Sequence, residues 1–161
     1  MVSRMSESKI VTQDFKKLDK FVKALAVADG YAVEVGILGN KTNRKGGGMT
    51  NADIGFLHEF GTAKMKRRSF LRMPLLMKTN QIIKDVMQAG ALRLFAEGKI
   101  ELILKYLGLA CESVILDAFD SAGFGEWDPD KVATTKRKKG STPLIDTGQL
   151  RRSITSRVVK I

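Results

Sequence analysis

Apolar residues recur along the chain with two different periods, and each period predicts a type of element. In Tyr31–Leu38 apolar residues alternate with small or polar ones, a pattern typical of a strand with one covered face. Ser153–Ile161, with Ile154, Val158 and Val159, predicts a second, terminal strand. Two strands alone make a marginal sheet, so either other strands lie in the loops or a neighbouring subunit completes the sheet.

Apolar positions three or four residues apart predict the helices. Four segments have this spacing: Gln13–Ala28, Thr50–Phe60, Leu75–Ala96 and Lys99–Phe119. Gly98 is the expected break between the last two. The third helix would place four apolar residues toward the core: Leu76, Ile83, Val86 and Leu94. The chain is therefore expected to be α+β, with a small mixed or antiparallel sheet packed against two long helices and long loops between the elements.

The helix predicted at Thr50–Phe60 has recognisable ends. Thr50 or Asn51 can cap its N-terminus, and Asp53 would lie in the positive first turn. Gly61 is expected to end it. Its core-facing residues are expected to be Ile54, Phe56 and Leu57.

The remaining segments are predicted to be loops. Gly39–Met49 is rich in glycine, but it lacks the Gly-Lys-Ser/Thr ending of a phosphate-binding loop, so a surface loop is favoured. Ser121–Thr142 is a long irregular stretch, and Pro143–Leu150 is a turn expected to open a short helix. With 161 residues the chain is expected to form a single domain, 1–161, in which residues 1–12 are a flexible N-terminus.

Composition narrows the class of protein. Hydrophobic residues make up 43% and aromatic residues 7%, which predicts a mostly aliphatic core. Apolar runs fall short of the ~18 residues that a membrane span needs, and the N-terminal residues lack the apolar centre of a signal peptide. We expect no membrane partner. We expect the protein to be synthesised in a reducing cytoplasm. The single cysteine, Cys111, lies in an apolar helical pattern and is expected to be a small buried hydrophobe.

Candidate catalytic and metal-binding groups are few. The chain has one histidine and one cysteine, which argues against zinc sites and Cys–His catalysis. His58 and Glu59 could form a general-base pair, but their place at a helix end favours a packing or capping role. An acidic cluster lacks the ligand spacing of a calcium loop: Asp117, Asp120, Glu126, Asp128 and Asp130. We therefore expect no catalytic, cofactor-binding or metal-binding residue, no cofactor, and a protein that is not an enzyme.

The formal net charge of +11 allows contact with nucleic acid or with an acidic protein surface. The basic residues expected to make such contacts lie in two loops: Lys64, Lys66, Arg67 and Arg68, and Lys136, Arg137, Lys138 and Lys139. Aromatic residues are not interleaved with them, so stacking on bases is not expected. Simple solvation, docking on an acidic partner and contact with DNA phosphates stay open as alternatives.

Three segments carry a resemblance. The first, Ile54–Gly61, contains His58-Glu59-Phe60-Gly61, and the second, Arg68–Leu71, has Phe70 before a leucine. The third is a pair whose two parts we call the third and fourth segments: Gly125–Pro129, around Trp127, and Pro143–Leu150 with the Ser153-Ile154 that follows. In this order they resemble the virion-morphogenesis and tail-completion families of long-tailed bacteriophages, which show His-Glu-Phe-Gly, Arg-Pro-Phe-Leu, Trp-x-Pro and Leu-x-Asp-Thr-Gly-x-Leu-x-x-Ser-Ile. The motif residues are His58, Glu59, Phe60, Gly61, Phe70, Trp127, Asp146, Thr147, Gly148 and Leu150.

The resembling segments also have a physical interpretation. Asp146 and Thr147 can hydrogen-bond free N–H groups at a helix start, and Leu150 and Ile154 would hold that turn in the core. Phe60 and Phe70 flank the first basic loop and would fix both its ends. Ser69 replaces the family's proline, which removes only a rigid turn.

The resemblance implies a structural protein at the head-proximal end of a phage tail, acting as a tail terminator, tail-completion or head–tail joining protein. It would form a ring, expected to be hexameric, around the DNA channel. Its partners would be other copies of itself, the tail tube protein and a neck or head-completion protein, while genomic DNA passes through the channel. It would be found in the virion after assembly in the host cytoplasm. The alternative is a basic, non-specific nucleic-acid-binding protein, which would show strongly salt-dependent DNA binding.

Overall fold

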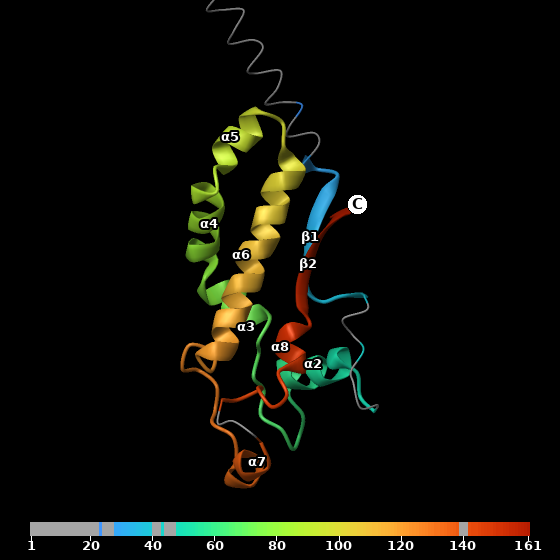
Figure 1. The fold of residues 1–161 in the computed structure, drawn as a ribbon, viewed down its shortest axis with the longest axis vertical. Coiled ribbons are helices and arrows are strands. Elements are labelled where there is room, and N and C mark those ends of the chain that lie inside the picture. The colour runs from blue at the N-terminus through green and yellow to red at the C-terminus, as the bar shows by residue number, and fades with distance from the viewer. Residues whose placement is uncertain (1–22, 24–27, 40–42, 44–47, 139–141) are drawn as a thin grey trace, which may run out of the picture.

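The computed structural model describes residues 23, 28–39, 43, 48–138 and 142–161. Residues 1–12, nearly all of the helix predicted at Gln13–Ala28, most of the glycine-rich loop and Lys139 lie outside the described residues. The described elements form an elongated molecule around one long helix, α6, which spans Ile100–Asp120 (Figure 1). The α+β class expected from the sequence is confirmed.

A two-stranded antiparallel ribbon covers one side of α6. It pairs β1, Tyr31–Ile37, with β2, Ile154–Lys160, and Tyr31 lies opposite Lys160. Both predicted strands are confirmed. The described loops contain no further strand, so the ribbon is the whole sheet of the described chain.

The ribbon has one face toward α6 and one toward solvent. At Gly108 of α6, an added Cβ would lie 2.9 Å from the Cβ of Ser156 and 3.4 Å from Val33, so helix and ribbon are in close contact there. On the opposite face Arg157 donates to Glu34 across the strands at 2.7 Å. The alternation seen in the sequence therefore places Val33 and Glu34 on opposite faces as expected, although Gly36, on the same face as Glu34, is the one buried residue of β1.

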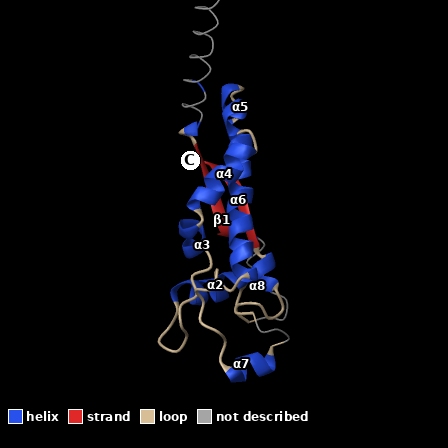
Figure 2. Cartoon of the chain, turned by 90° about the vertical axis from the view of Figure 1, so that its left-hand side faces the viewer, coloured by secondary structure: helices blue, strands red, loops and turns tan. Residues whose placement is uncertain are grey.

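Three short helices cover the other side of α6: α3 (Arg72–Met77), α4 (Thr79–Gln88) and α5 (Ala91–Ala96). Figure 1 shows α4 and α5 on the side of α6 opposite the ribbon, and Figure 2 views the molecule from that side, with the strands behind the helices. The prediction of one long helix over Leu75–Ala96 is wrong, as is that of two long helices against the sheet. Lys78 has non-helical backbone angles, and Gly90 has a left-handed backbone with φ +89° that separates α4 from α5.

Because of these breaks, the three short helices turn different residues toward the core than one continuous helix would. Leu76 and Ile83, predicted to face the core, are 78% and 55% exposed. Ile82 is buried in place of Ile83, whereas Leu94 is buried as predicted. The error in the helix phase follows from the junction at Lys78, which the apolar spacing did not reveal.

The best-packed part of the core lies at the C-terminal end of α6. Its buried residues are Phe70, Ile115, Ala118, Phe119, Trp127, Leu150 and Ile154. Most buried hydrophobic residues are aliphatic, as expected, but three aromatic rings lie at the centre of this cluster. Phe70 and Phe119 have ring centroids 5.4 Å apart, and Trp127 meets Phe119 edge-on at 5.8 Å.

The helix α2, Asn51–Phe60, has the predicted ends. Thr50 accepts a hydrogen bond from the Asp53 N–H at 3.1 Å, and Asp53 accepts one from the Thr50 N–H at 2.9 Å, which together form a capping box. Gly61 ends the helix with φ +75°, and a Cβ there would lie 2.9 Å from the Arg67 nitrogen.

The buried face of α2 differs from the prediction. Asn51, Gly55 and Glu59 are buried, whereas Phe56 is 62% exposed. A Cβ at Gly55 would lie 2.7 Å from the Ile37 side chain, so the absence of a side chain lets α2 pack closely on the end of β1. The sequence placed Phe56 toward the core because of its apolarity, but Gly55 and Glu59 occupy that face.

The segment after α6 is more ordered than predicted. Ala122, Gly123, Phe124 and Gly125 all have positive φ, between 51° and 88°, so the chain makes a left-handed turn directly after the helix. The Trp127 N–H closes this turn on the Ala122 carbonyl at 3.1 Å. A further short helix, α7 (Val132–Arg137), follows within the stretch predicted to be irregular.

Two other expectations concern burial and membranes. Cys111 is half-buried, and burial raises the pKa of its thiol above the ordinary value. Across the part of the chain that the structure describes, every helix is too short or too polar to span a membrane.

Candidate functional site

The four resembling segments meet at one end of the molecule, around a buried carboxylate. Glu59, at the end of α2, is 4% exposed. Its Oε1 accepts from the Ser69 hydroxyl at 2.7 Å and from Arg72 Nε at 2.9 Å. Its Oε2 accepts from the Phe70 and Leu71 N–H groups at 2.9 and 3.0 Å. Glu59 thus binds the N–H groups that precede α3, which have no partner within that helix.

Ser69 completes this arrangement. Besides donating to Glu59, its hydroxyl accepts from the Met73 N–H at 3.1 Å. A proline at this position, as in the resembling family, would lack both bonds. The serine in place of the family's proline therefore adds hydrogen bonds that connect α2 to α3.

Glu59 is ionised at neutral pH. Burial alone would raise its pKa, but the hydrogen bonds from Arg72, Leu71 and Ser69 together lower the pKa below its ordinary value of 4.5. Both oxygens are occupied by donors, so the carboxylate acts as a structural anion and is poorly placed to take a proton from a substrate.

His58 lies beside this site on the same helix. Its Nδ1 is buried and has no hydrogen-bond partner among the described residues. Burial lowers its pKa, the charges of Arg68 and Lys138 lower it further, and Asp130 partly opposes them. The imidazole is therefore neutral at pH 7. The backbone carbonyl of His58 accepts from the Arg68 N–H at 2.8 Å, which fixes one end of the first basic loop.

Trp127 joins the third segment to the second. Its ring is 7% exposed, and its Nε1 donates to the Ser69 carbonyl at 3.3 Å. Phe70 is fully buried, as expected of a residue that fixes one end of the basic loop. Phe60, expected to fix the other end, is 52% exposed. Its ring contacts Phe56, with centroids 4.7 Å apart, and lies under the Arg72 guanidinium, so this part of the prediction is wrong.

The fourth segment opens α8, Gln149–Arg152, as predicted, but without the predicted side-chain cap. The residue before α8 is Gly148, with φ +71°, and the side chains of Asp146 and Thr147 do not cap the helix. The carbonyl of Thr147 instead accepts from Arg152 Nη2 at 2.8 Å. Leu150 and Ile154 are 4% and 7% exposed, which confirms that they hold the turn in the core.

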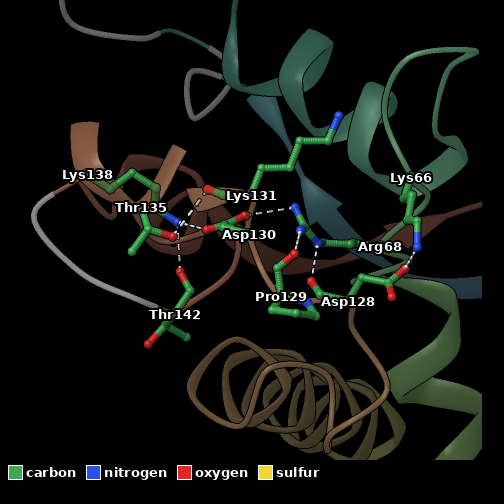
Figure 3. A network of polar contacts seen from close by, with 9 residues as sticks. All are labelled: Lys66, Arg68, Asp128, Pro129, Asp130, Lys131, Thr135, Lys138 and Thr142. Carbon is green, nitrogen blue, oxygen red and sulfur yellow. Dashed lines mark hydrogen bonds and ion pairs between the residues drawn. The ribbon is translucent and has the colours of Figure 1, made fainter. Parts of the chain in front are cut away.

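The two basic loops lie side by side and share one carboxylate, Asp130 (Figure 3). Arg68 and Lys138 both form ion pairs with Asp130, at 3.1 and 2.5 Å. The three side chains are 12%, 10% and 5% exposed, and we call them the Asp130 cluster. Arg68 also donates to the carbonyls of Asp128 and Pro129. Arg68 and Lys138 are therefore ion-paired within the chain, so their charge is already partly balanced by Asp130.

The acidic segment that the sequence offered as a weak metal-site candidate is explained by these pairs. Asp128 binds Lys66 at 3.0 Å in an exposed pair, and Asp120 binds Arg151 at 2.7 Å. The described residues contain no group of three side chains placed to hold a metal ion. Sequence reasoning missed these pairs because Asp120 and Arg151 lie 31 residues apart, Lys66 and Asp128 lie about twice as far apart, and the loops have no regular period.

Four of the predicted contact residues are exposed and have no ion pair within the described chain: Lys64, Arg67, Lys136 and Arg137. Lys66 is exposed but paired. Lys64, Lys66 and Arg137 line a hollow of about 1000 Å³ between the first basic loop, α7 and the turn before α8, which we call the basic groove, whereas Arg67 and Lys136 lie outside its lining. Ile54, Leu144 and Leu150 contribute apolar surface to it, and His58 lies in its wall.

Chemically, the arrangement can bind but offers little for a reaction. Glu59, Asp128 and Asp130 accept hydrogen bonds or ion pairs, and the one histidine is neutral and half-buried. Among the described residues, the unpaired charged groups of the groove are the cations Lys64, Lys131 and Arg137 and one exposed carboxylate, Asp146. Compared with protein-family models, with curated proteins and with solved structures, the chain has no significant match.

Proposed function

We propose that this chain is a structural protein of a tailed bacteriophage at the head-proximal end of the tail. It would act there in tail termination, tail completion or head–tail joining, as a ring around the DNA channel. The proposal originates in the resemblance of the four segments. The observation that supports it best is their convergence: residues from all four, separated by up to ninety positions, lie in one packed unit around Glu59, Phe70, Trp127 and Leu150.

Two features of the surface favour assembly with other copies. Among the described residues the ribbon has two strands, so each strand has one edge without a hydrogen-bonded neighbouring strand, and such an edge can pair with another chain. Apolar side chains are also exposed along the half of the molecule farther from the Glu59 site: Ile83, Met87, Leu92 and Leu109. Exposed apolar surface of this kind is typical of protein–protein contact.

The alternative of a non-specific nucleic-acid-binding protein gains less support. Several of the basic residues on which it relied are bound to carboxylates of the same chain, and the lining of the basic groove contains no phenylalanine, tyrosine or tryptophan to stack on bases.

Electron microscopy tests the proposal. The purified chain, alone or added to isolated tail tubes, should form closed rings of uniform diameter. Particles produced without this protein should carry overlong tails if it terminates the tail, or normal tails detached from full heads if it joins them. A chain that stays monomeric at every concentration and on tail tubes, together with normal particles in its absence, would contradict the proposal.

A further inference from the structure

We propose that the basic groove binds an extended acidic segment of a partner protein. The inference rests on the proposed function, in which this chain docks on neighbouring virion proteins. It adds that the contact is a segment inserted into a groove, and it identifies which cations make the contact.

The size and lining of the groove fit a peptide segment. Its volume of about 1000 Å³ is at the upper end of ordinary ligand pockets and exceeds what a single side chain would fill. Ile54, Leu144 and Leu150 provide apolar contacts in its lining, while cations line its sides. A segment that alternates acidic and aliphatic residues matches both surfaces.

The charge balance of the groove favours an anion. The cations in its lining are Lys64, Lys66, Arg68, Lys131, Arg137 and Lys138, and the carboxylates are Asp128, Asp130 and Asp146. Lys66 is paired with Asp128, while Arg68 and Lys138 share Asp130. Lys64, Lys131 and Arg137 have no ion pair within the described chain, and Figure 3 shows the Lys131 side chain pointing away from Asp130. Positive charge in a concave site attracts an acidic segment and sets its orientation.

The walls of the groove are held in place before binding. The Asp130 cluster joins the first basic loop to α7, so two walls from distant parts of the chain keep a fixed separation. A preformed groove avoids the cost of ordering loops when the segment binds.

The single histidine makes a direct assay possible. His58 lines the groove, and because the chain has no other histidine its ring protons give one assignable set of NMR signals. The probe is an eight-residue peptide of alternating glutamate and leucine, and a lysine–leucine peptide of the same length is the charge control. We expect the acidic peptide to shift the His58 signals in the intact chain and the basic peptide to leave them unchanged.

Two charge-reversal variants locate the contact. Lys64→Glu with Arg137→Glu changes the groove, whereas Lys84→Glu with Lys160→Glu changes net charge equally at exposed positions outside its lining. The groove variant should bind the acidic peptide about tenfold more weakly or worse, and the control variant should bind nearly as the wild type does. Thermal melts of both should match the wild type, because exposed charges contribute only about 0–1 kcal/mol each.

Four results would overturn the inference, three in the binding assays and one in assembly. The acidic peptide fails to move the His58 signals, or both variants lose affinity equally, or an oligothymidylate of the same charge shifts His58 as strongly as the peptide does. The proposed function is judged separately by ring formation and tail morphology. If the groove variant still forms rings and joins tails to heads at wild-type efficiency, the groove inference fails and the proposed function stands.

Discussion

The buried carboxylate of Glu59 accepts five hydrogen bonds from four residues. Whichever of its oxygens is replaced by an amide group in Glu59→Gln, at least two N–H or O–H donors then face another donor. We expect this variant to lower the free energy of unfolding by about 2–4 kcal/mol, because buried donors lose their acceptors. Chemical denaturation measures it.

The control for Glu59→Gln is Glu101→Gln on α6, where the carboxylate forms an exposed pair with Lys105 at 3.0 Å. That change should stay within about 0.5 kcal/mol. Equal losses in the two variants would mean that the hydrogen bonds of Glu59 contribute nothing particular to stability.

The lowered pKa of His58 predicts that the free energy of unfolding depends on pH. Its pKa is lowered in the folded chain, so as pH falls below 6.5 the unfolded chain binds a proton more readily than the folded chain does. Stability from the neutral imidazole is therefore full above pH 6.5 and is lost as pH falls toward the folded pKa. Between pH 7 and 5.5 the wild type should lose more unfolding free energy than His58→Gln, by at most about 1.4 kcal/mol. A larger loss in the variant would reverse the sign and refute this account.

The sequence predicts individual residues well where the physics is local. Thr50 as cap, Gly61 as helix end and Leu150 as a core residue depend on their immediate neighbours, and all three are confirmed. The role of Glu59 was out of reach, because its donors belong to a segment ten or more residues later that has no helical period of its own.

At the scale of elements, the end of α6 stores backbone strain. Ala122 and Phe124 have φ of 51° and 57°, which costs roughly 1–2 kcal/mol for a residue with a side chain. Ala122→Gly should therefore raise the unfolding free energy by about 0.5–1 kcal/mol, because glycine adopts this conformation without steric cost. A thermal or urea melt measures the change.

The matched control is Ala110→Gly inside α6, which should lower stability by about 1 kcal/mol since glycine is a poor helix former. The opposite signs of the two alanine-to-glycine changes are the test. A loss in both variants would show that the turn after α6 is not strained at Ala122.

Element lengths were predicted unevenly, and the reason is physical. Apolar spacing located both strands and α6, because each has one continuous covered face, whereas the bounds of α2 followed from its cap at Thr50 and its end at Gly61. It merged α3, α4 and α5 into one helix, since the spacing persists through junctions at Lys78 and Gly90 that change the helix direction. Residues 121–127 lack any period, so their left-handed turn left no signal beyond its glycines.

For the whole molecule, α7 is held mainly by charge. None of its residues is buried, and the Asp130 cluster connects it to the rest of the chain. Asp130→Asn leaves Arg68 and Lys138 without their anion, so we expect α7 to open locally and trypsin cleavage after Lys136 and Arg137 to rise about tenfold. The melting temperature should change little, because α7 contributes almost no apolar burial.

Asp128→Asn is the control for this change. It removes only an exposed pair with Lys66, and Arg68 still binds the Asp128 and Pro129 carbonyls in either variant. Its cleavage pattern should match the wild type. Equal cleavage in all three proteins would show that charge does not hold α7.

The overall class was predictable, but the arrangement of charges was not. The periods of apolar residues predict the α+β class. They cannot show that one aspartate, Asp130, forms an ion pair with a cation from each basic loop. That pairing divides the eight predicted contact residues into a buried structural pair, Arg68 and Lys138, and a mostly exposed set, with Lys139 outside the described residues.

The pairing of β1 with β2 affects how the chain is made. Tyr31 lies opposite Lys160, so the ribbon cannot form until residue 160 has left the ribosome, although β1 emerges early. Until then the apolar face of β1 and the matching side of α6 have no permanent cover, and contacts this distant in sequence form slowly. Nascent chains should therefore depend on chaperones until synthesis passes β2. Shortened chains that end before residue 154 should be degraded and not incorporated, which makes the synthesis of β2 a requirement for assembly.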